Sequence, residues 1–430
     1  MNPPTFPEQL QQAAEAARQH DYATAVQIYD DLLVAISADT EDSEQRQTRL
    51  TALRERGRFL DTMGEPQAAL AAFEQYYLEA GSSDKAVDAL VLIGNQQTYI
   101  GLHQQALGTH QEALQLAEAL NDTYGRAQAI GGMGLVLSRL SRNEEAIVNL
   151  HQSLSLFEQI DNKIEQARAW NRVAVAHVHL GQVDKSIAAL KTCLLIAADL
   201  GLHDSTTLVT SINALSNLGE CYQQLYDMQQ ALSYHMQALA TVAGYNLNSM
   251  EADTRRNIGV ELRHLGRVDE GIDYLYEALH LAEETLQPDV KLQALYSLAL
   301  AEMERGKLDA GLQHAQRLRA LAETEGLPGH RAEALHAIGL YHKLKDDTAV
   351  AGQLWQQALF LAHETGRRYL LWQLHAGLAE IAVSTALAEV HYRIAAEVIR
   401  QIAEPISDEE IKQKFLKAPI IARILAKASD

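Results

Sequence analysis

The hydrophobic positions of the chain repeat with the period of an α-helix. In residues 164–200, apolar side chains recur in steps of three and four from Ala167 to Val178, stop at Gly181 and resume at Ile187. Such steps place side chains on one face of a helix, and the alternation typical of a β-strand is absent. The segment therefore predicts two amphipathic helices joined by a tight turn.

Small residues recur along the whole chain at intervals of about 40 residues, a period that predicts an array of one repeated supersecondary unit. The first series is Ala13, Gly57, Gly94, Gly134, Ala174, Gly219, Gly259, Ala299, Gly339 and Ala379. A second series follows the first at a constant spacing, as Ala25 follows Ala13. It consists of Ala25, Ala69, Ala106, Ala146, Ser186, Ala231, Gly271, Gly311, Ala351 and, as the exception, His391.

Close helix packing explains the small residues. Glycine inside a helix costs about 1 kcal/mol relative to alanine, so its recurrence at one register predicts that two antiparallel helices cross there. Five further glycines lie midway between the two series, where the first helix of each unit must end: Gly64, Gly101, Gly181, Gly266 and Gly306. Pro3, Pro4 and Pro7 are expected to precede the first helix, in keeping with a helical array.

These features together resemble the tetratricopeptide repeat. Segments 216–222 (Ser-Asn-Leu-Gly-Glu-Cys-Tyr) and 230–235 (Gln-Ala-Leu-Ser-Tyr-His) look most like it, and the 40-residue spacing resembles the longer-helix variety found in spindle-orientation adaptors and bacterial signalling regulators. The resemblance implies an all-α, right-handed α-solenoid of about ten helical hairpins over residues 8–404. Residues 1–7 are then a lead-in, and residues 405–430 a C-terminal capping helix and tail.

The C-terminal segment departs from the repeat. Ser407 and Glu410 are spaced as a capping box, and Pro419 should kink or divide the helix that follows. A terminal unit of a solenoid must cover an exposed apolar end, so we expect an end cap. The alternative is an amphipathic segment for a partner or a membrane.

Charge narrows the possible partners. The formal net charge is −20, from 36 basic and 56 acidic residues, which opposes binding to nucleic acid and to anionic lipid. We find no apolar run of membrane-spanning length and no secretory signal, so a cytoplasmic location is expected. Cys193 and Cys221 lie in helical patterns and are expected to be buried thiols.

Motifs for chemistry are missing from the sequence. There is no His-Glu-x-x-His and no Gly-x-Ser-x-Gly, and no nucleophile and base can be paired. The stretch 181–186 superficially resembles a phosphate loop but occupies an inter-helix turn. His110 and His235 share one repeat register, which favours packing, and close packing also explains Gly131, Gly132 and Gly134. We expect no enzyme activity, no metal site and no cofactor.

The resemblance implies that an extended peptide binds along the groove lined by the first helix of each unit. Nine polar residues occupy inner-face registers of the fifth to seventh units: Arg168, Asn171, Arg172, Asn213, Asn217, Glu220, Arg256, Asn257 and Arg263. Arginine can bind carboxylates through two hydrogen bonds, and asparagine can pair with a peptide backbone. Alternatively, these groups are solvated or pair with Glu220, Asp253 and Glu261.

Two further inner-face regions are candidates. Arg54 and Arg58 form a smaller basic site in the second unit. Units eight to ten have apolar inner positions that could bind an apolar segment or the array's own tail: Tyr296, Leu300, Met303, Leu340 and Leu344.

The leading functional hypothesis is a non-catalytic scaffold or adaptor that binds an acidic, extended peptide of a protein partner. The alternative is a regulatory signalling receptor in which a peptide or small ligand changes the pitch of the array. A homo-oligomer formed through the terminal units is also possible from the sequence.

Overall fold

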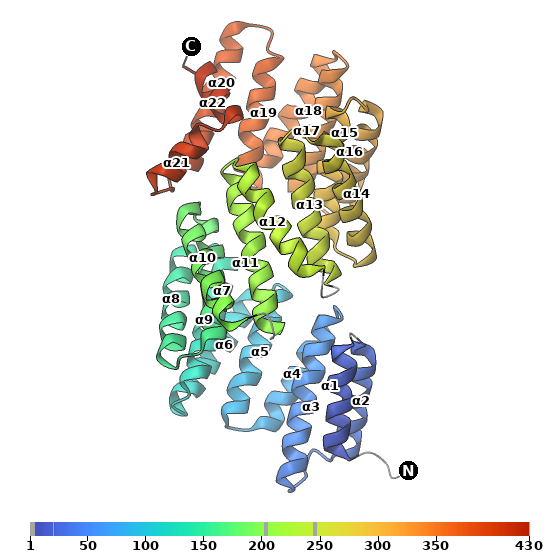
Figure 1. The fold of residues 1–430 in the computed structure, drawn as a ribbon, viewed down its shortest axis with the longest axis vertical. Helices are drawn as coiled ribbons and strands as arrows, with labels where there is room; N and C mark the ends of the chain where they lie inside the picture. The colour runs from blue at the N-terminus through green and yellow to red at the C-terminus, as the bar shows by residue number, and fades with distance from the viewer. Residues whose placement is uncertain (1–4, 20, 202–204, 244–246, 430) are drawn as a thin grey trace. The chain divides into compact units, whose positions relative to one another are not determined.

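The structure is a computed structural model that describes residues 5–19, 21–201, 205–243 and 247–429 (Figure 1). The regular secondary structure of these residues is entirely α-helical, as the sequence predicts. The chain divides into two compact units, residues 1–179 and 180–430. Among the described residues, no helix is both long enough and apolar enough to span a membrane.

Unit 1 consists of four helical hairpins followed by a single helix that packs on the fourth hairpin. Its helices are α1 (Phe6–Arg18), α2 (Tyr22–Ala35), α3 (Ser43–Thr62), α4 (Pro66–Ala80), α5 (Asp84–Tyr99), α6 (His103–Ala119), α7 (Thr123–Arg139), α8 (Asn143–Gln159) and α9 (Lys163–His179). The odd-numbered helices are the first helices of the repeat.

Unit 2 begins with one helix and continues with five hairpins and two short helices. They are α10 (Val183–Leu200), α11 (Ser205–Gln224), α12 (Met228–Val242), α13 (Asn248–His264), α14 (Val268–Glu284), α15 (Pro288–Glu304), α16 (Leu308–Thr324), α17 (Pro328–Leu344), α18 (Thr348–Glu364), α19 (Arg368–Glu380), α20 (Thr385–Ala403), α21 (Glu409–Leu416) and α22 (Pro419–Lys427).

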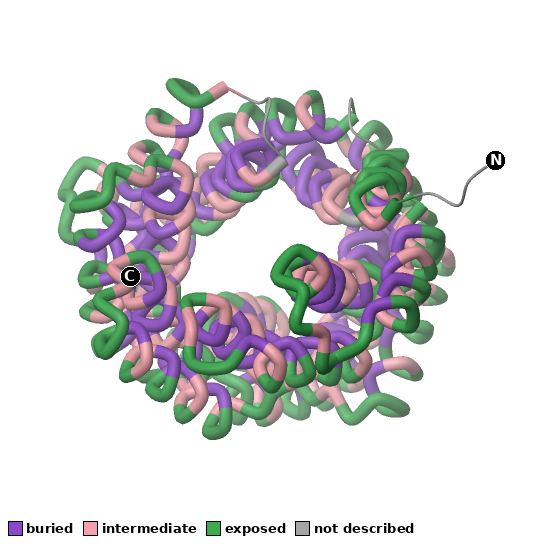
Figure 2. Tube along the Cα trace, turned by 90° about the horizontal axis from the view of Figure 1, so that it is seen from below, coloured by how far each residue is buried: buried purple, intermediate pink, exposed green. Residues whose placement is uncertain are grey.

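The recurrent small residues lie where helices pack against each other. All ten residues of the first series are buried, and so is every residue of the second series except the half-buried His391. Figure 2 shows that buried positions gather where helices face one another, whereas the turns are mainly exposed. The close-packing explanation for the two series is therefore confirmed.

A bulky side chain on the second helix of the hairpin fills the space that each glycine of the first series leaves. A Cβ added at Gly57 would lie 2.4 Å from the ring of Phe73, and one at Gly219 would lie 2.3 Å from the ring of His235. Gly339 accommodates Trp355 in the same way, at 2.3 Å from its Nε1. At Ala299 and Ala379 the corresponding residue of the second helix is alanine, Ala315 or Ala395, whereas Ala13 and Ala174 keep a large one, Tyr29 or Leu190. Glycine is therefore found where the facing side chain is large, but alanine is accepted opposite both large and small residues.

The predicted turn glycines adopt the backbone conformation that ends the first helix. Gly64, Gly101, Gly181, Gly266 and Gly306 all have positive φ, between 71° and 87°. Glycine adopts this left-handed conformation without the steric cost that a Cβ imposes.

At the same register in the sixth repeat stands Tyr226, with φ of 57°. Its ring packs against Trp372, with the ring centroids 5.9 Å apart, and against Phe415, at 6.5 Å. Ser141 and Asp346 adopt the same conformation at this register in the fourth and ninth repeats, with φ of 60° and 63°, so glycine is favoured there but not required.

The first helix begins earlier than the sequence predicted. Pro7 was expected before it, but α1 begins at Phe6, and Pro7 lies in its first turn. Proline is tolerated there because the first backbone N–H groups of a helix need no intrahelical acceptor. The backbone N–H of Thr5 donates to Glu8 at 2.7 Å. Residues 1–4 of the lead-in, which include Pro3 and Pro4, lie outside the described residues.

The C-terminal segment is two short helices instead of one, because Pro419 starts α22. The division at Pro419 is as predicted, but the predicted capping box is wrong. Asp408 caps α21 by accepting from the backbone N–H of Ile411 at 3.1 Å. Ser407 instead donates through both its hydroxyl and its backbone N–H to Asp184 on α10.

The C-terminal segment also anchors to the first helices of unit 2, which lie far earlier in the chain. Asp184 Oδ2 accepts from the backbone N–H groups of Ser407 and Asp408 at 3.0 and 2.9 Å, besides the Ser407 hydroxyl. Lys414 pairs with Asp227 at 2.5 Å, and Phe415 is 1% exposed. Burial raises the pKa of Asp184, but these hydrogen bonds outweigh burial and lower it.

Asp184→Ala is expected to release this anchor without disturbing the hairpins. Losing one charged acceptor that serves three donors should weaken tail docking by about 2 kcal/mol, equivalent to a roughly 30-fold faster amide exchange in α21. Hydrogen exchange measured by mass spectrometry checks this. Asp199→Ala, an exposed substitution on the same helix α10, is the control and should leave exchange in α21 unchanged.

Candidate functional site

Three of the predicted groove residues, Arg168, Asn171 and Arg172, lie on α9 in unit 1. All three are partly buried, and Asn171 is engaged in an interaction within the protein. Arg168 Nη1 pairs with Glu165 Oε1 at 2.6 Å, one turn earlier on the same helix. The charge of Arg168 is therefore largely satisfied inside the protein.

Arg172 differs, because it has neither a hydrogen bond nor an ion pair among the described residues. Burial, with a smaller contribution from the neighbouring Arg168, lowers its pKa to about 10. A Cβ added at Gly131 would lie 3.3 Å from Arg172 Nη1, so this glycine leaves room for the guanidinium. Arg172 is a desolvated cation that remains charged at neutral pH and has unused donors.

The other six predicted residues lie in unit 2 and fall on two first helices. Asn213, Asn217 and Glu220 are on α11, and Arg256, Asn257 and Arg263 are on α13. Asn213 is exposed, whereas Asn217 is partly buried and interacts within the protein.

The arginines of α13 are paired with carboxylates. Arg256 Nη2 lies 2.8 Å from Asp253 Oδ1, and Arg263 Nη1 lies 3.0 Å from Glu304 Oε2. Burial alone would lower the pKa of Arg256, but Asp253 and the nearby Glu220 outweigh burial and raise it. Burial, reinforced by Asp253, also raises the pKa of Glu220. Pairing with carboxylates of the protein, Asp253 among them, is what the alternative to peptide binding predicts for these residues.

Beneath this face lies a fully buried polar group. His235 Nδ1 is 2.6 Å from Glu261 Oε1, and His235 Nε2 is 3.1 Å from the carbonyl oxygen of Ser216. Asn257 is also fully buried, and both polar atoms of its side chain lack a hydrogen-bond partner among the described residues. In this conformation Asn257 is not exposed to a ligand.

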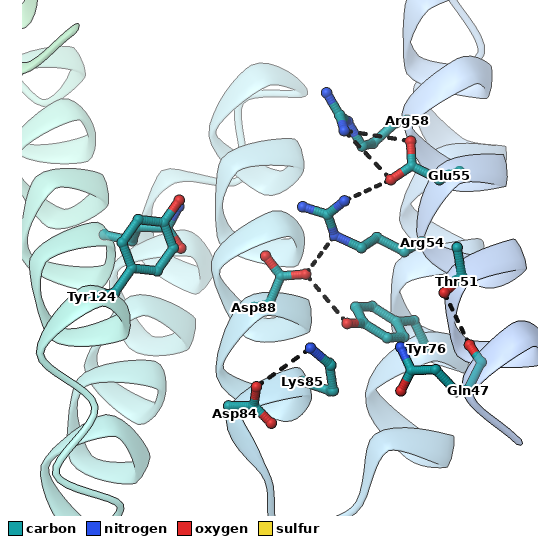
Figure 3. Close-up of polar contacts among 11 residues, drawn as sticks. Gln47, Thr51, Arg54, Glu55, Arg58, Tyr76, Asp84, Lys85, Asp88 and Tyr124 are labelled. Atoms are coloured by element: carbon teal, nitrogen blue, oxygen red, sulfur yellow. Dashed lines mark hydrogen bonds and ion pairs between the residues drawn. The ribbon is translucent and has the colours of Figure 1, made fainter. Parts of the chain in front are cut away.

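A pocket of about 430 Å³ lies on the inner face of unit 1, between α3, α5 and α7. It contains Arg54 of the smaller predicted site, which reaches from α3 toward Asp88 on α5 (Figure 3). Arg54 Nε donates to Asp88 Oδ2 at 2.7 Å, and Arg54 Nη1 donates to Glu55 at 2.5 Å. Arg58 lies 3.4 Å from the same glutamate. The two predicted arginines are thus joined by Glu55.

The sequence prediction missed the other residues of this pocket. Asp88 lies six positions before Gly94, an inner-face register, so the rule applied to units five to seven would have found it in the third unit. Asp122 and Tyr124 precede the inner-face registers of the fourth unit, and no local signal marks them. Tyr124 lies on the side of Asp88 opposite Arg54 in Figure 3.

Of the apolar candidates in units eight to ten, Leu344 is 46% exposed and Leu340 packs against a buried core cluster. Tyr296 and Leu300 pack against a buried core cluster, and Met303 is 3% exposed. The predicted packing of the tail on the array occurs, but Phe415 packs on Tyr226 and not on these residues. Cys193 and Cys221 are buried, as predicted, and burial raises the pKa of both thiols to about 12.

Comparison with known proteins supports the repeat assignment. Residues 167–200 match the tetratricopeptide repeat family model. No curated protein matches the chain in sequence.

Several solved structures have the same fold. The apo form of RapI matches with a TM-score of 0.61 at 16% identity, covering 83% of this chain and 98% of RapI. A Rap protein complexed with competence and sporulation factor gives 0.61 at 17% identity, covering 83% and 99%. The apo quorum sensor NprR from B. thuringiensis gives 0.54 at 14% identity, covering 91% and 98%. The chain is therefore a helical-repeat protein with a tetratricopeptide repeat at residues 167–200 and the fold of these solved arrays.

Proposed function

We propose that the protein is a non-catalytic scaffold that binds an extended, carboxylate-bearing peptide segment of a protein partner on its inner helices. The observation that carries this proposal is Arg172, the one inner-face arginine of α9 and α13 that has no carboxylate partner among the described residues. Burying a cation without a counterion is costly, so a ligand carboxylate that pairs with it is favoured.

The chemistry of the guanidinium favours a carboxylate. Its planar donors form two parallel hydrogen bonds with a carboxylate, and such bonds are stronger where water is partly excluded. Glu165 forms its ion pair with Arg168 and not with Arg172, so no carboxylate of α9 is bonded to the Arg172 guanidinium. A side-chain carboxylate and a peptide C terminus both fit this description.

The comparisons support peptide binding in general. Two of the structures that share this fold contain peptide-type ligands, a Rap protein with competence and sporulation factor and a Rap conjugation regulator with the Phr* peptide. The overall charge of −20 disfavours nucleic acid and anionic membranes as the partner.

A regulatory receptor is the second candidate, and the anchored C-terminal segment favours it. The contacts of Ser407 and Lys414 with α10 and the α11–α12 turn define one closed arrangement of unit 2. A ligand that binds more tightly to the closed or the released arrangement would shift the population of the two.

Arg172→Gln is expected to weaken peptide binding at least 30-fold, corresponding to about 2 kcal/mol for a desolvated charge pair. The measurement is fluorescence anisotropy with a labelled hexapeptide library in two forms, one with free and one with amidated C termini. Arg139→Gln, which removes an exposed arginine from the same unit, should bind as the wild type does. Thermal melting verifies that both variants are folded.

Two results would count against this assignment. One is a peptide that binds the wild type and Arg172→Gln equally well. The other is a library in which amidation and loss of acidic residues leave every affinity unchanged.

A further inference from the structure

The pocket of unit 1 contains a carboxylate that no cation of the described residues neutralises. Asp122 lines the pocket and caps α7, and its Oδ1 accepts from the backbone N–H of Gly125 at 2.9 Å. Within the described part of the chain, neither lysine nor arginine forms an ion pair with Asp122. The cap uses only one of its two oxygens.

Asp88 supplies a second unused acceptor to the same pocket. Its Oδ2 receives hydrogen bonds from Arg54 at 2.7 Å and from the hydroxyl of Tyr76 at 3.3 Å. Its other oxygen, Oδ1, accepts no hydrogen bond from the described residues, and Figure 3 shows it directed away from Arg54. The carboxylate is therefore held in place by two donors while half of its acceptor capacity remains available.

The cations of the pocket are already occupied. Arg54 is held between Asp88 and Glu55, and Glu55 is shared with Arg58. Lys85 lies 3.3 Å from its neighbour Asp84. Acidic groups exceed basic ones in the lining, which has the carboxylates Glu55, Asp84, Asp88 and Asp122 and the cations Arg54 and Lys85, so the pocket is suited to a positively charged group.

Aromatic rings complete the walls. Tyr76 is buried beside Asp88, and Tyr124 lies across the pocket on α7 (Figure 3). Tyrosine faces attract ammonium and guanidinium groups. A volume of about 430 Å³ is enough for the end of one long side chain together with adjacent backbone.

We propose that this pocket binds the cationic side chain, lysine or arginine, of the peptide that the inner face holds. This inference rests on the proposed function and specifies where the positive and negative groups of the bound peptide lie. A basic residue occupies the pocket between α3, α5 and α7, and a carboxylate pairs with Arg172 on α9.

Helix α7 takes part in both sites, because Asp122 and Tyr124 at its N-terminal end line the pocket and a Cβ added at Gly131 would lie 3.3 Å from Arg172 Nη1. Burial raises the pKa of Tyr124, and the next contributions come from Glu165 and Arg168 on α9, followed by Asp88 and Arg54 of the pocket. A peptide that follows α7 would therefore meet both sites.

Methyl NMR of the full-length protein tests the pocket directly, because Leu50 and Val87 line it. The probe is Nα-acetyl-arginine amide, and Nα-acetyl-norleucine amide is the neutral control. The arginine probe should shift the methyl signals of Leu50 and Val87 in a saturable way, and the neutral probe should not. Equal binding of both probes, or binding of neither, would overturn the proposal.

Matched variants locate the effect. Asp88→Asn and Asp122→Asn should each weaken binding of the arginine probe at least tenfold, because each loses a charged acceptor. Both retain their structural hydrogen bonds, since asparagine accepts from Arg54 and is also a good N-cap. Glu74→Gln removes an exposed carboxylate of α4 and should change nothing. Unchanged binding in both aspartate variants would contradict the assignment.

The same experiment separates this proposal from the proposed function. If library peptides bind and depend on Arg172, but replacing their basic residues with norleucine leaves the affinity unchanged, the pocket assignment fails and the scaffold function stands. If the arginine probe binds the pocket but no library peptide binds the protein, the pocket is a cation site and the peptide-binding function fails.

Discussion

Trp355→Ala is expected to lower the free energy of unfolding by about 3–5 kcal/mol, the cost of a large cavity in a close-packed core. Trp355 is 2% exposed, and its Nε1 donates to the carbonyl oxygen of His336 at 3.0 Å. Its ring lies against two glycines, and a Cβ added at Gly339 or Gly377 would lie within 3 Å of it. The backbones are held at the separation that the indole requires, so the site cannot collapse without moving helices.

Urea unfolding followed by circular dichroism measures this loss, and hydrogen exchange shows whether it is local to α17–α19. Local readout matters because repeat arrays unfold partly in segments. Phe360→Ala is the matched control, since Phe360 is 63% exposed on the same helix α18. Its effect should stay within about 0.5 kcal/mol. Similar losses for the two variants would show that packing over Gly339 does not govern stability.

Acidification is expected to destabilise unit 1 through His110 by about 2–3 kcal/mol between pH 7 and pH 4.5. His110 is fully buried over Gly94 and Gly132, and neither ring nitrogen has a hydrogen-bond partner among the described residues. Burial, with a smaller contribution from Arg172, lowers its pKa to about 4 from the ordinary 6.5.

The direction follows from proton linkage. As the pH falls below 6.5, the unfolded chain takes up a proton at this histidine while the native protein does not. Stability is therefore greatest above pH 6.5 and is lost progressively down to pH 4. The measurement is unfolding by denaturant at several pH values, comparing wild type with His110→Phe.

Phenylalanine suits this position because Phe73 occupies the same register over Gly57. The variant should show a flatter dependence of stability on pH, whatever its stability at pH 7. His151→Phe, which replaces an exposed histidine of α8, should leave the slope as in the wild type. A slope that does not change in His110→Phe would mean that this imidazole takes up its proton over the same pH range in the native and unfolded states, which would contradict the prediction.

Much of the fold follows from local sequence rules. Gly57 and Gly339 mark helix crossings because only a missing Cβ allows the ring from the second helix of the hairpin to fit. Turn positions such as Gly101 are equally predictable, since their positive φ is a property of a single residue. These signals depend on sequence spacing alone, so they do not require knowledge of the tertiary structure.

Long-range contacts lie beyond such rules. Ser407 and Asp184 are separated by 223 positions, and nothing in either segment identifies the other. Asp408 was missed as the cap because Ser407 satisfied the same local pattern, and the choice depends on the distant carboxylate.

The candidate site likewise has features that local sequence predicts and one feature that it does not. Arg168–Glu165 and Arg256–Asp253 are pairs three residues apart on one helix, so their pairing could be anticipated. The lack of a partner at Arg172 could not, because it depends on how neighbouring helices pack around the guanidinium.

The most direct test of the account is photo-crosslinking of the full-length protein to a library hexapeptide that carries a diazirine beside its carboxylate. The account predicts that mass spectrometry finds crosslinks on α7 and α9 close to Arg172, and that they disappear in Arg172→Gln. Crosslinks confined to the second helices of the repeats, or unchanged in that variant, would contradict a recognition site on the inner helices.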